Sequence, residues 1–163
     1  MAYKFGVILV SLCIITAGIK KRAVSNIKSK NGLLFLKLLQ HIKNEISSKR
    51  TSLYCSLLNF DQSAYKKTPF YQHVKQNGLA NTDVFFEKNG DMLFHKGVSY
   101  ILADFFDEIE KSKNAFQSAI ICDSYISKLE KNISESKAFF ETKTKLESSL
   151  CFLGAAALFV VLI

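Results

Sequence analysis

The stretch AIICDSYISKLEKNISESKAFF, residues 119–140, carries the longest periodic pattern in the chain. Apolar and small residues recur there at alternating spacings of three and four, as in a heptad seam on an α-helix. The seam consists of Ala119, Cys122, Ile126, Leu129, Ile133, Ser136 and Phe140. The pattern predicts a long helix that packs along this seam and continues toward the C-terminus.

Helical periodicity also marks the regions on either side of this stretch. The chain has only one proline and seven glycines, so long helices are interrupted at few points. Further helices are expected at 31–50, where Leu34, Leu38, Ile42 and Ile46 form a stripe widened by Phe35 and Leu39, and at 53–60 and 98–109. The sequence therefore predicts an all-α fold, a membrane-anchored bundle of about six helices.

Local signals place the shorter helices between these elements. Thr68-Pro69 is typical of an N-cap followed by proline at the first helical position, and this helix should stop near Asn77-Gly78. Thr82 is expected to cap the next helix. Asn89-Gly90-Asp91 is a turn signal. A break is expected near residues 111–114.

The two ends of the chain are strongly apolar. Residues 5–19 and 150–163 contain no charged side chain. Each run is shorter than the roughly 20 residues that span a bilayer, but each can recruit neighbouring residues. Buried core helices are the alternative for both runs, and a signal peptide is the alternative for the first. We expect uncleaved anchors at 1–19 and 149–163, with a helical bundle at 20–148.

Cations flank the inner ends of both apolar runs and predict the topology. Lys20, Lys21 and Arg22 follow the first run, and Lys143 and Lys145 precede the second. Cytoplasmic flanks of membrane segments carry the excess of lysine and arginine. We therefore expect residues 20–148 to lie in the cytoplasm.

Charge is unevenly distributed along the chain. Residues 20–75 carry twelve lysines or arginines against two acids, within a net charge of +8. Such a basic region next to an apolar run favours anionic lipid headgroups as a partner. Nucleic acid is the rival partner, but the cations are scattered along an amphipathic helix without a nucleic-acid-binding motif. We expect no nucleic-acid binding.

The sequence contains no recognisable catalytic or metal-binding motif. The cysteines and histidines do not stand at ligand spacing, and we expect buried apolar positions for Cys13, Cys55, Cys122 and Cys151. No phosphate-binding glycine loop, zinc-protease motif or nucleophile elbow is present. The acidic residues of 104–110 favour a solvated helix face over a metal site. Glu45 and Gln117 are each expected to form either a buried hydrogen bond or a helix-capping contact. The prediction is a protein without enzymatic activity, cofactor or small-molecule substrate.

Several short matches give the chain a resemblance to a known family. Glu45-Ile46, Thr51 and Leu53 fit one of its motifs, with Ser48 in place of a tyrosine and Ser52 in place of a proline. Gln117 fits the opening of the long helix, although Glu110 and Lys113 replace a glycine and an aspartate. The C-terminal matches are Lys145-Leu146, Ser149-Leu150, Phe152-Leu153-Gly154 and residues 160–163, with Cys151 and Ala155 in place of glycines. In these motifs and in layout, the chain resembles the stage III sporulation protein AB family.

The resemblance implies a structural role in the channel assembly between mother cell and forespore. The family is similar to the inner-membrane platform protein of type II secretion systems. It implies a protein of the mother-cell membrane that binds other stage III sporulation membrane proteins and a secretion-type ATPase. The candidate contact or structural residues are Glu45, Lys49, Arg50, Gln117 and Gly154. A generic two-anchor membrane adaptor is the alternative function.

Overall fold

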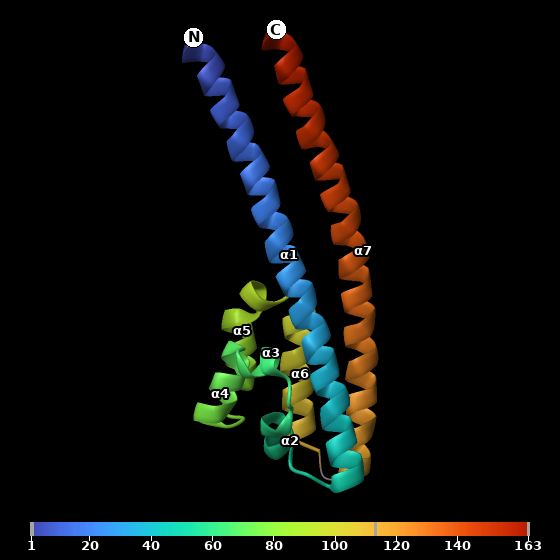
Figure 1. Ribbon diagram of the computed structural model, residues 1–163. Helices are drawn as coiled ribbons and strands as arrows, with labels where there is room; N and C mark the ends of the chain where they lie inside the picture. The colour runs from blue at the N-terminus through green and yellow to red at the C-terminus, as the bar shows by residue number, and fades with distance from the viewer. Residues whose placement is uncertain (1, 113, 163) are drawn as a thin grey trace. The chain divides into compact units, whose positions relative to one another are not determined.

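The computed structural model describes the backbone of residues 2–112 and 114–162. Side chains are described except at 1–15, 17, 113, 144, 148, 151–152 and 155–163. This part of the chain forms seven α-helices and no strand (Figure 1). The helices are α1 Ala2–Lys49, α2 Leu53–Asn59, α3 Ser63–Lys66, α4 Pro69–Asn77, α5 Thr82–Leu93, α6 Val98–Glu110 and α7 Ala115–Leu162. The all-α prediction is confirmed, and the expected number of helices is exceeded by the short α3.

The chain divides into two compact units, and α1 and α7 contribute to both. One unit contains residues 28–136, and the other contains 1–27 and 137–163. In the larger unit, α1 and α7 are antiparallel neighbours (Figure 1). Lys43 Nζ lies 2.6 Å from Asp123 Oδ1. Gly32 permits close approach further along, since a Cβ there would lie 3.3 Å from Ile133 Cγ1.

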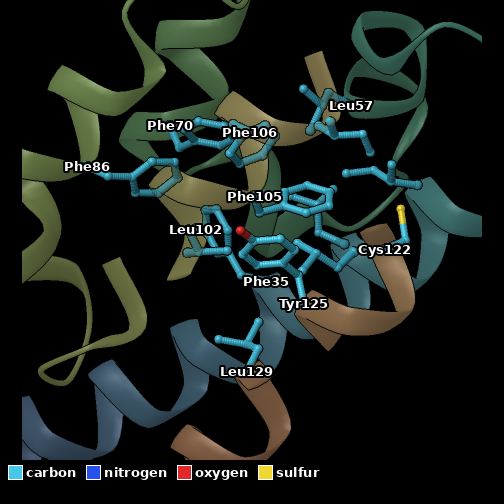
Figure 2. Close-up of a cluster of buried hydrophobic side chains, with 14 of the residues drawn as sticks. Phe35, Leu57, Phe70, Phe86, Leu102, Phe105, Phe106, Cys122, Tyr125 and Leu129 are labelled. Carbon is cyan, nitrogen blue, oxygen red and sulfur yellow. The ribbon is translucent and has the colours of Figure 1, made fainter. Parts of the chain in front are cut away.

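Aromatic side chains fill the core of the larger unit. Phe35 of α1 lies at its centre, with ring centroids 5.0 Å from Phe94 and 5.4 Å from Phe70. Phe86 stacks on Phe106 at 5.7 Å (Figure 2). Aromatic pairs in such geometries add to the stabilisation from apolar burial. The high phenylalanine content of the sequence therefore supplies the interior of this bundle.

The predicted stripe of α1 and the middle of the predicted α7 seam face this core, whereas the last seam residue, Phe140, belongs to the smaller unit. Cys122 and Leu129 of α7 are fully buried, and Ile126 and Ile133 pack against the core. Tyr125 is also buried, so the seam is wider than a strict heptad stripe. The predicted stripe of α1 is confirmed as well, with buried positions at Phe35, Leu38, Leu39, Ile42 and Ile46.

Several of the local start and stop signals are confirmed. Thr68 Oγ1 accepts a hydrogen bond from the Tyr71 N–H at 3.2 Å, and Pro69 is the first residue of α4. Gly78 ends this helix with φ 65°, a conformation that glycine adopts at little cost. The cap predicted at Thr82 is wrong. Thr82 is the buried first residue of α5, after Asn81 in the left-handed region at φ 57°.

The turn predicted at Asn89-Gly90-Asp91 is also wrong, because these residues lie within α5. Gly90 is buried against α6. A Cβ at this position would lie 2.7 Å from Ser99 Oγ and closer still to Ser99 Cβ. The glycine therefore serves the close packing of two helices, a role that its dipeptide context does not distinguish from a turn.

Gly90→Ala is expected to destabilise the chain by about 1–2 kcal/mol, since overpacking outweighs the roughly 1 kcal/mol by which alanine favours a helix. Adding Ser99→Gly should recover most of the loss. The nearest remaining atom would then be the Cα of residue 99, at 3.7 Å. Urea unfolding of both single variants and the double variant measures this coupling. If the changes in unfolding free energy of the two single variants add up to that of the double variant, the side chains at positions 90 and 99 do not clash.

The smaller unit contains the two ends of the chain. Lys21 Nζ lies 2.8 Å from Glu147 Oε1 and joins α1 to α7 there. Most of the predicted anchors 1–19 and 149–163, including Cys13 and Cys151, lies outside the described side chains. Among the side chains that are described, no helix is both long and apolar enough to cross a membrane.

Candidate partner-binding site

The corner between α1 and α2 contains three of the predicted site residues. Lys49 is the last residue of α1, and Arg50 has φ 53°, in the left-handed region that few residues other than glycine adopt. Ser52 then caps α2, because its hydroxyl accepts a hydrogen bond from the Cys55 N–H at 3.3 Å. The corner thus stops the first long helix where the sequence predicted.

Glu45 holds this corner together. Its side chain is only 11% exposed and accepts hydrogen bonds from Lys49 Nζ at 2.7 Å and Thr51 Oγ1 at 3.4 Å. Its backbone carbonyl accepts the Thr51 N–H at 3.4 Å. The hydrogen bond and positive charge of Lys49 lower the pKa of Glu45, although its partial burial opposes this. The geometry gives Glu45 a structural role in the turn.

The two cations of the corner differ in their surroundings. The Lys49 side chain is 67% exposed, and its ammonium group forms an ion pair with Glu45. Arg50 is exposed and belongs to the turn itself. Arg50 is therefore the clearer candidate for a contact with an acidic partner.

Gln117 lies in the first turn of α7 and is exposed, so of the two expected roles the structure shows the capping contact and not the buried hydrogen bond. Its backbone N–H donates a hydrogen bond to Asn114 Oδ1 at 2.8 Å. Asn114 therefore caps the long helix, a role that its position before the periodic run would have suggested. Ser118 supports this start through a hydrogen bond from its hydroxyl to the Asn114 carbonyl at 3.0 Å.

The start of α7 also exposes two large apolar side chains that the sequence analysis did not select. Phe116 is 78% exposed and Ile120 is 55% exposed. They are four residues apart and so share one face of the helix. Because α1 and α7 are antiparallel in this unit, this face and the Arg50 corner lie at the same end of the bundle (Figure 1).

Gly154 belongs to the smaller unit, and the structure does not join it to the corner residues. It is exposed, and among the described residues outside its own helical turn no atom lies within 4 Å of the position that a Cβ would take. The structure therefore brings Glu45, Lys49 and Arg50 together, places Gln117 at the start of α7 and leaves Gly154 in a separate region.

The acidic face of α6 makes ordinary surface contacts. Asp107 Oδ2 lies 2.6 Å from Lys111 Nζ, and Tyr125 donates its hydroxyl to Glu108 Oε2 at 2.7 Å. Burial and this hydrogen bond raise the pKa of Tyr125. Lys128 lies 4.1 Å from the centre of the same ring. Within the described residues, no three histidine, cysteine or acidic side chains are grouped to hold a metal ion.

Two cysteines fall within the described side chains. Cys122 is buried as expected, and burial raises the pKa of its thiol to about 12. Cys55 is exposed, which contradicts the expectation of a buried position. It lies in the first turn of α2, where the neighbouring Leu57 takes the core position instead.

Comparison with known proteins gave no support for or against a family. No family model matches the chain, and neither the curated proteins nor the solved structures include a match.

Proposed function

We propose that this chain is a membrane-held scaffold protein of the stage III sporulation protein AB type. It binds other ring components of the channel assembly and a secretion-type ATPase, and it catalyses no reaction. The observation that carries the proposal is the extent of α1 and α7. Each helix has 48 residues and a core-forming segment, and α1 also includes the apolar run 5–19 while α7 also includes residues 150–162 of the second run.

In this proposal, residues 1–19 and 149–163 hold the chain in the mother-cell membrane that faces the forespore. Residues 20–148 lie in the cytoplasm, where the ATPase is accessible. The cations at 20–22, Lys143 and Lys145 support this orientation. A generic two-anchor membrane adaptor has the same layout and remains the second candidate function.

The end of the bundle that bears Arg50, Phe116 and Ile120 is the proposed ATPase surface. Arginine and aromatic side chains supply a large share of the binding energy at protein interfaces. Exposed cations also steer and orient an acidic partner. Glu45 contributes indirectly, since it fixes the turn that presents Arg50.

The test is recovery of the ATPase with the tagged full-length chain from sporulating cells. Carbonate-washed membranes are solubilised, and the captured proteins are identified by mass spectrometry. Arg50→Glu is expected to lower ATPase recovery several-fold, because it replaces attraction by repulsion. Arg50→Gly should lower it less, because glycine suits the left-handed turn and only the cation is lost. Lys75→Glu, a charge reversal at an exposed position on α4, is the matched control.

Equal recovery with wild type and a folded Arg50→Glu variant would remove this surface from the proposal. A wild-type chain that stays in washed membranes but captures no secretion-type component would favour the generic adaptor. Release of the chain by carbonate would contradict the membrane-held scaffold itself.

A further inference from the structure

An ion pair aligns the two charged segments that border the apolar runs. Lys21 Nζ of α1 lies 2.8 Å from Glu147 Oε1 of α7, within the smaller unit. The two helices run in opposite directions there, so α1 reaches its N-terminal end and α7 its C-terminal end on the same side of this pair (Figure 1). The structure thus brings together the flanks 20–25 and 143–148, which are far apart in the sequence.

The aligned flanks form a narrow band of positive charge. At a rise of about 1.5 Å per residue, both flanks fall within the same segment of about 8 Å along the helix axes. The band contains five cations and one acid, so its net charge is +4. All five cations are exposed, and together they are called the collar: Lys20, Lys21, Arg22, Lys143 and Lys145.

The one acid of the band is engaged by Lys21 and leaves the collar strongly positive. The hydrogen bond from Lys21 lowers the pKa of Glu147, and the charges of Lys21 and Lys143 act in the same direction, although desolvation opposes them. Lys20 and Arg22 stand one position before and one position after Lys21. They therefore lie about 100° to either side of the ion pair on the circumference of α1, and the collar presents positive charge around the helix.

Exposed apolar side chains border the collar on the side of the two apolar runs. Ile19 is 64% exposed and Leu150 is 65% exposed. Each lies within about 5 Å of the ion pair along its own helix. An apolar layer directly beside a layer of cations matches the boundary between the acyl chains and the phosphate groups of a bilayer. Nucleic acid offers phosphates without an apolar layer, so lipid is the occupant that accounts for both features.

We propose that the collar binds the headgroups of anionic phospholipids in the cytoplasmic leaflet. The inference rests on the proposed function, because 1–19 and 149–163 must lie in the bilayer for the collar to meet its phosphate layer. The height of the collar equals about one Debye length at physiological ionic strength, so all five cations act on the same layer. Each lysine or arginine near an anionic surface raises the affinity about fivefold. The chain therefore gathers anionic lipids around itself.

Lipid selectivity of the full-length chain in reconstituted vesicles tests the proposal. Electron paramagnetic resonance of spin-labelled phosphatidylglycerol and phosphatidylcholine measures the fraction of each lipid that the chain immobilises. Averaged over all lipids around the chain, the association constant for phosphatidylglycerol is expected to exceed that for phosphatidylcholine by about threefold or more. High salt should remove most of this preference. Equal association of the two lipids, or a preference that salt leaves unchanged, would overturn the proposal.

Charge-removing variants locate the lipid-binding surface. Lys20→Gln combined with Arg22→Gln removes two cations of the collar and leaves the ion pair to α7 in place. This double variant is expected to lower the preference for phosphatidylglycerol by about twofold or more. Lys37→Gln combined with Lys67→Gln, at exposed positions of the larger unit, is the matched control and should leave the preference unchanged. An unchanged preference in the collar variant, or an equal loss in the control, would refute the assignment to the collar.

Two further measurements separate the lipid from other phosphates and from the proposed function. Excess glycerol phosphate, the soluble headgroup, should not reduce the preference for phosphatidylglycerol. Displacement of the lipid by glycerol phosphate or by a short DNA duplex would overturn the lipid proposal. A chain that stays in carbonate-washed membranes without any lipid preference would refute the collar alone. A chain that carbonate releases but that still sediments with phosphatidylglycerol vesicles would refute the membrane-held function and retain the collar as a lipid surface.

Discussion

Phe35→Ala is expected to lower the free energy of unfolding by about 3–5 kcal/mol, the usual loss for a buried phenylalanine. Phe35 is 1% exposed and contacts four aromatic rings, those of Tyr65, Phe70, Phe86 and Phe94. These rings come from α3, α4, α5 and the residue after α5. The alanine variant therefore loses packing in four parts of the bundle, and no single neighbour can move to fill the space.

Urea unfolding followed by circular dichroism measures this loss. Leu33→Ala is the matched control, because Leu33 lies two residues away on α1 and is about half exposed. The control should change the free energy of unfolding by less than about 1 kcal/mol. Similar losses for both variants would show that the aromatic cluster is not the centre of the core.

Periodicity in the sequence predicted the long elements well because burial repeats along them. The stripe on α1 and the seam on α7 each combine several turns with the same pattern, so an error at one residue does not change the result. Thr68-Pro69 was equally informative, because proline restricts the backbone locally. These signals act within one helix and do not depend on the rest of the fold.

Features that depend on contacts between helices could not be predicted in this way. Gly90 follows asparagine and precedes aspartate, as turn glycines often do, but its proximity to Ser99 explains its presence. Cys55 was assigned to the core from residue type, whereas the orientation of the short α2 decides its exposure. Two or three residues cannot reveal such an orientation.

The candidate site likewise combines features that the sequence predicted with features that depend on the folded geometry. The chain direction change after Lys49 was foreseeable from the end of the apolar stripe. The left-handed Arg50 and the bonds from Glu45 to Lys49 and Thr51 depend on the folded geometry. Phe116 and Ile120 were missed because an apolar residue beside a seam is ordinarily assigned to the interior.

Leu129→Asp is expected to unfold most of the larger unit at room temperature. Leu129 is fully buried on α7, at the point where the predicted seam meets the core (Figure 2). Leu129→Ala should cost about 2–5 kcal/mol through lost burial and the resulting cavity. Aspartate adds the cost of burying a charge or of protonating it, so its effect must be larger. A loss of this size approaches the whole stability of a typical domain, about 5–15 kcal/mol.

Ile120→Asp is the control for this charge, since Ile120 lies on the same helix with more than half of its surface exposed. Thermal unfolding of the full-length chain by circular dichroism should give a melting temperature near wild type for Ile120→Asp. The melting temperature should fall from wild type to Leu129→Ala, and Leu129→Asp should show little cooperative unfolding above room temperature. An unchanged melting temperature for Leu129→Asp would mean that water reaches residue 129, and the seam would then be a surface for a partner. A large loss for Ile120→Asp would instead place the start of α7 inside the core and remove it from the proposed ATPase surface.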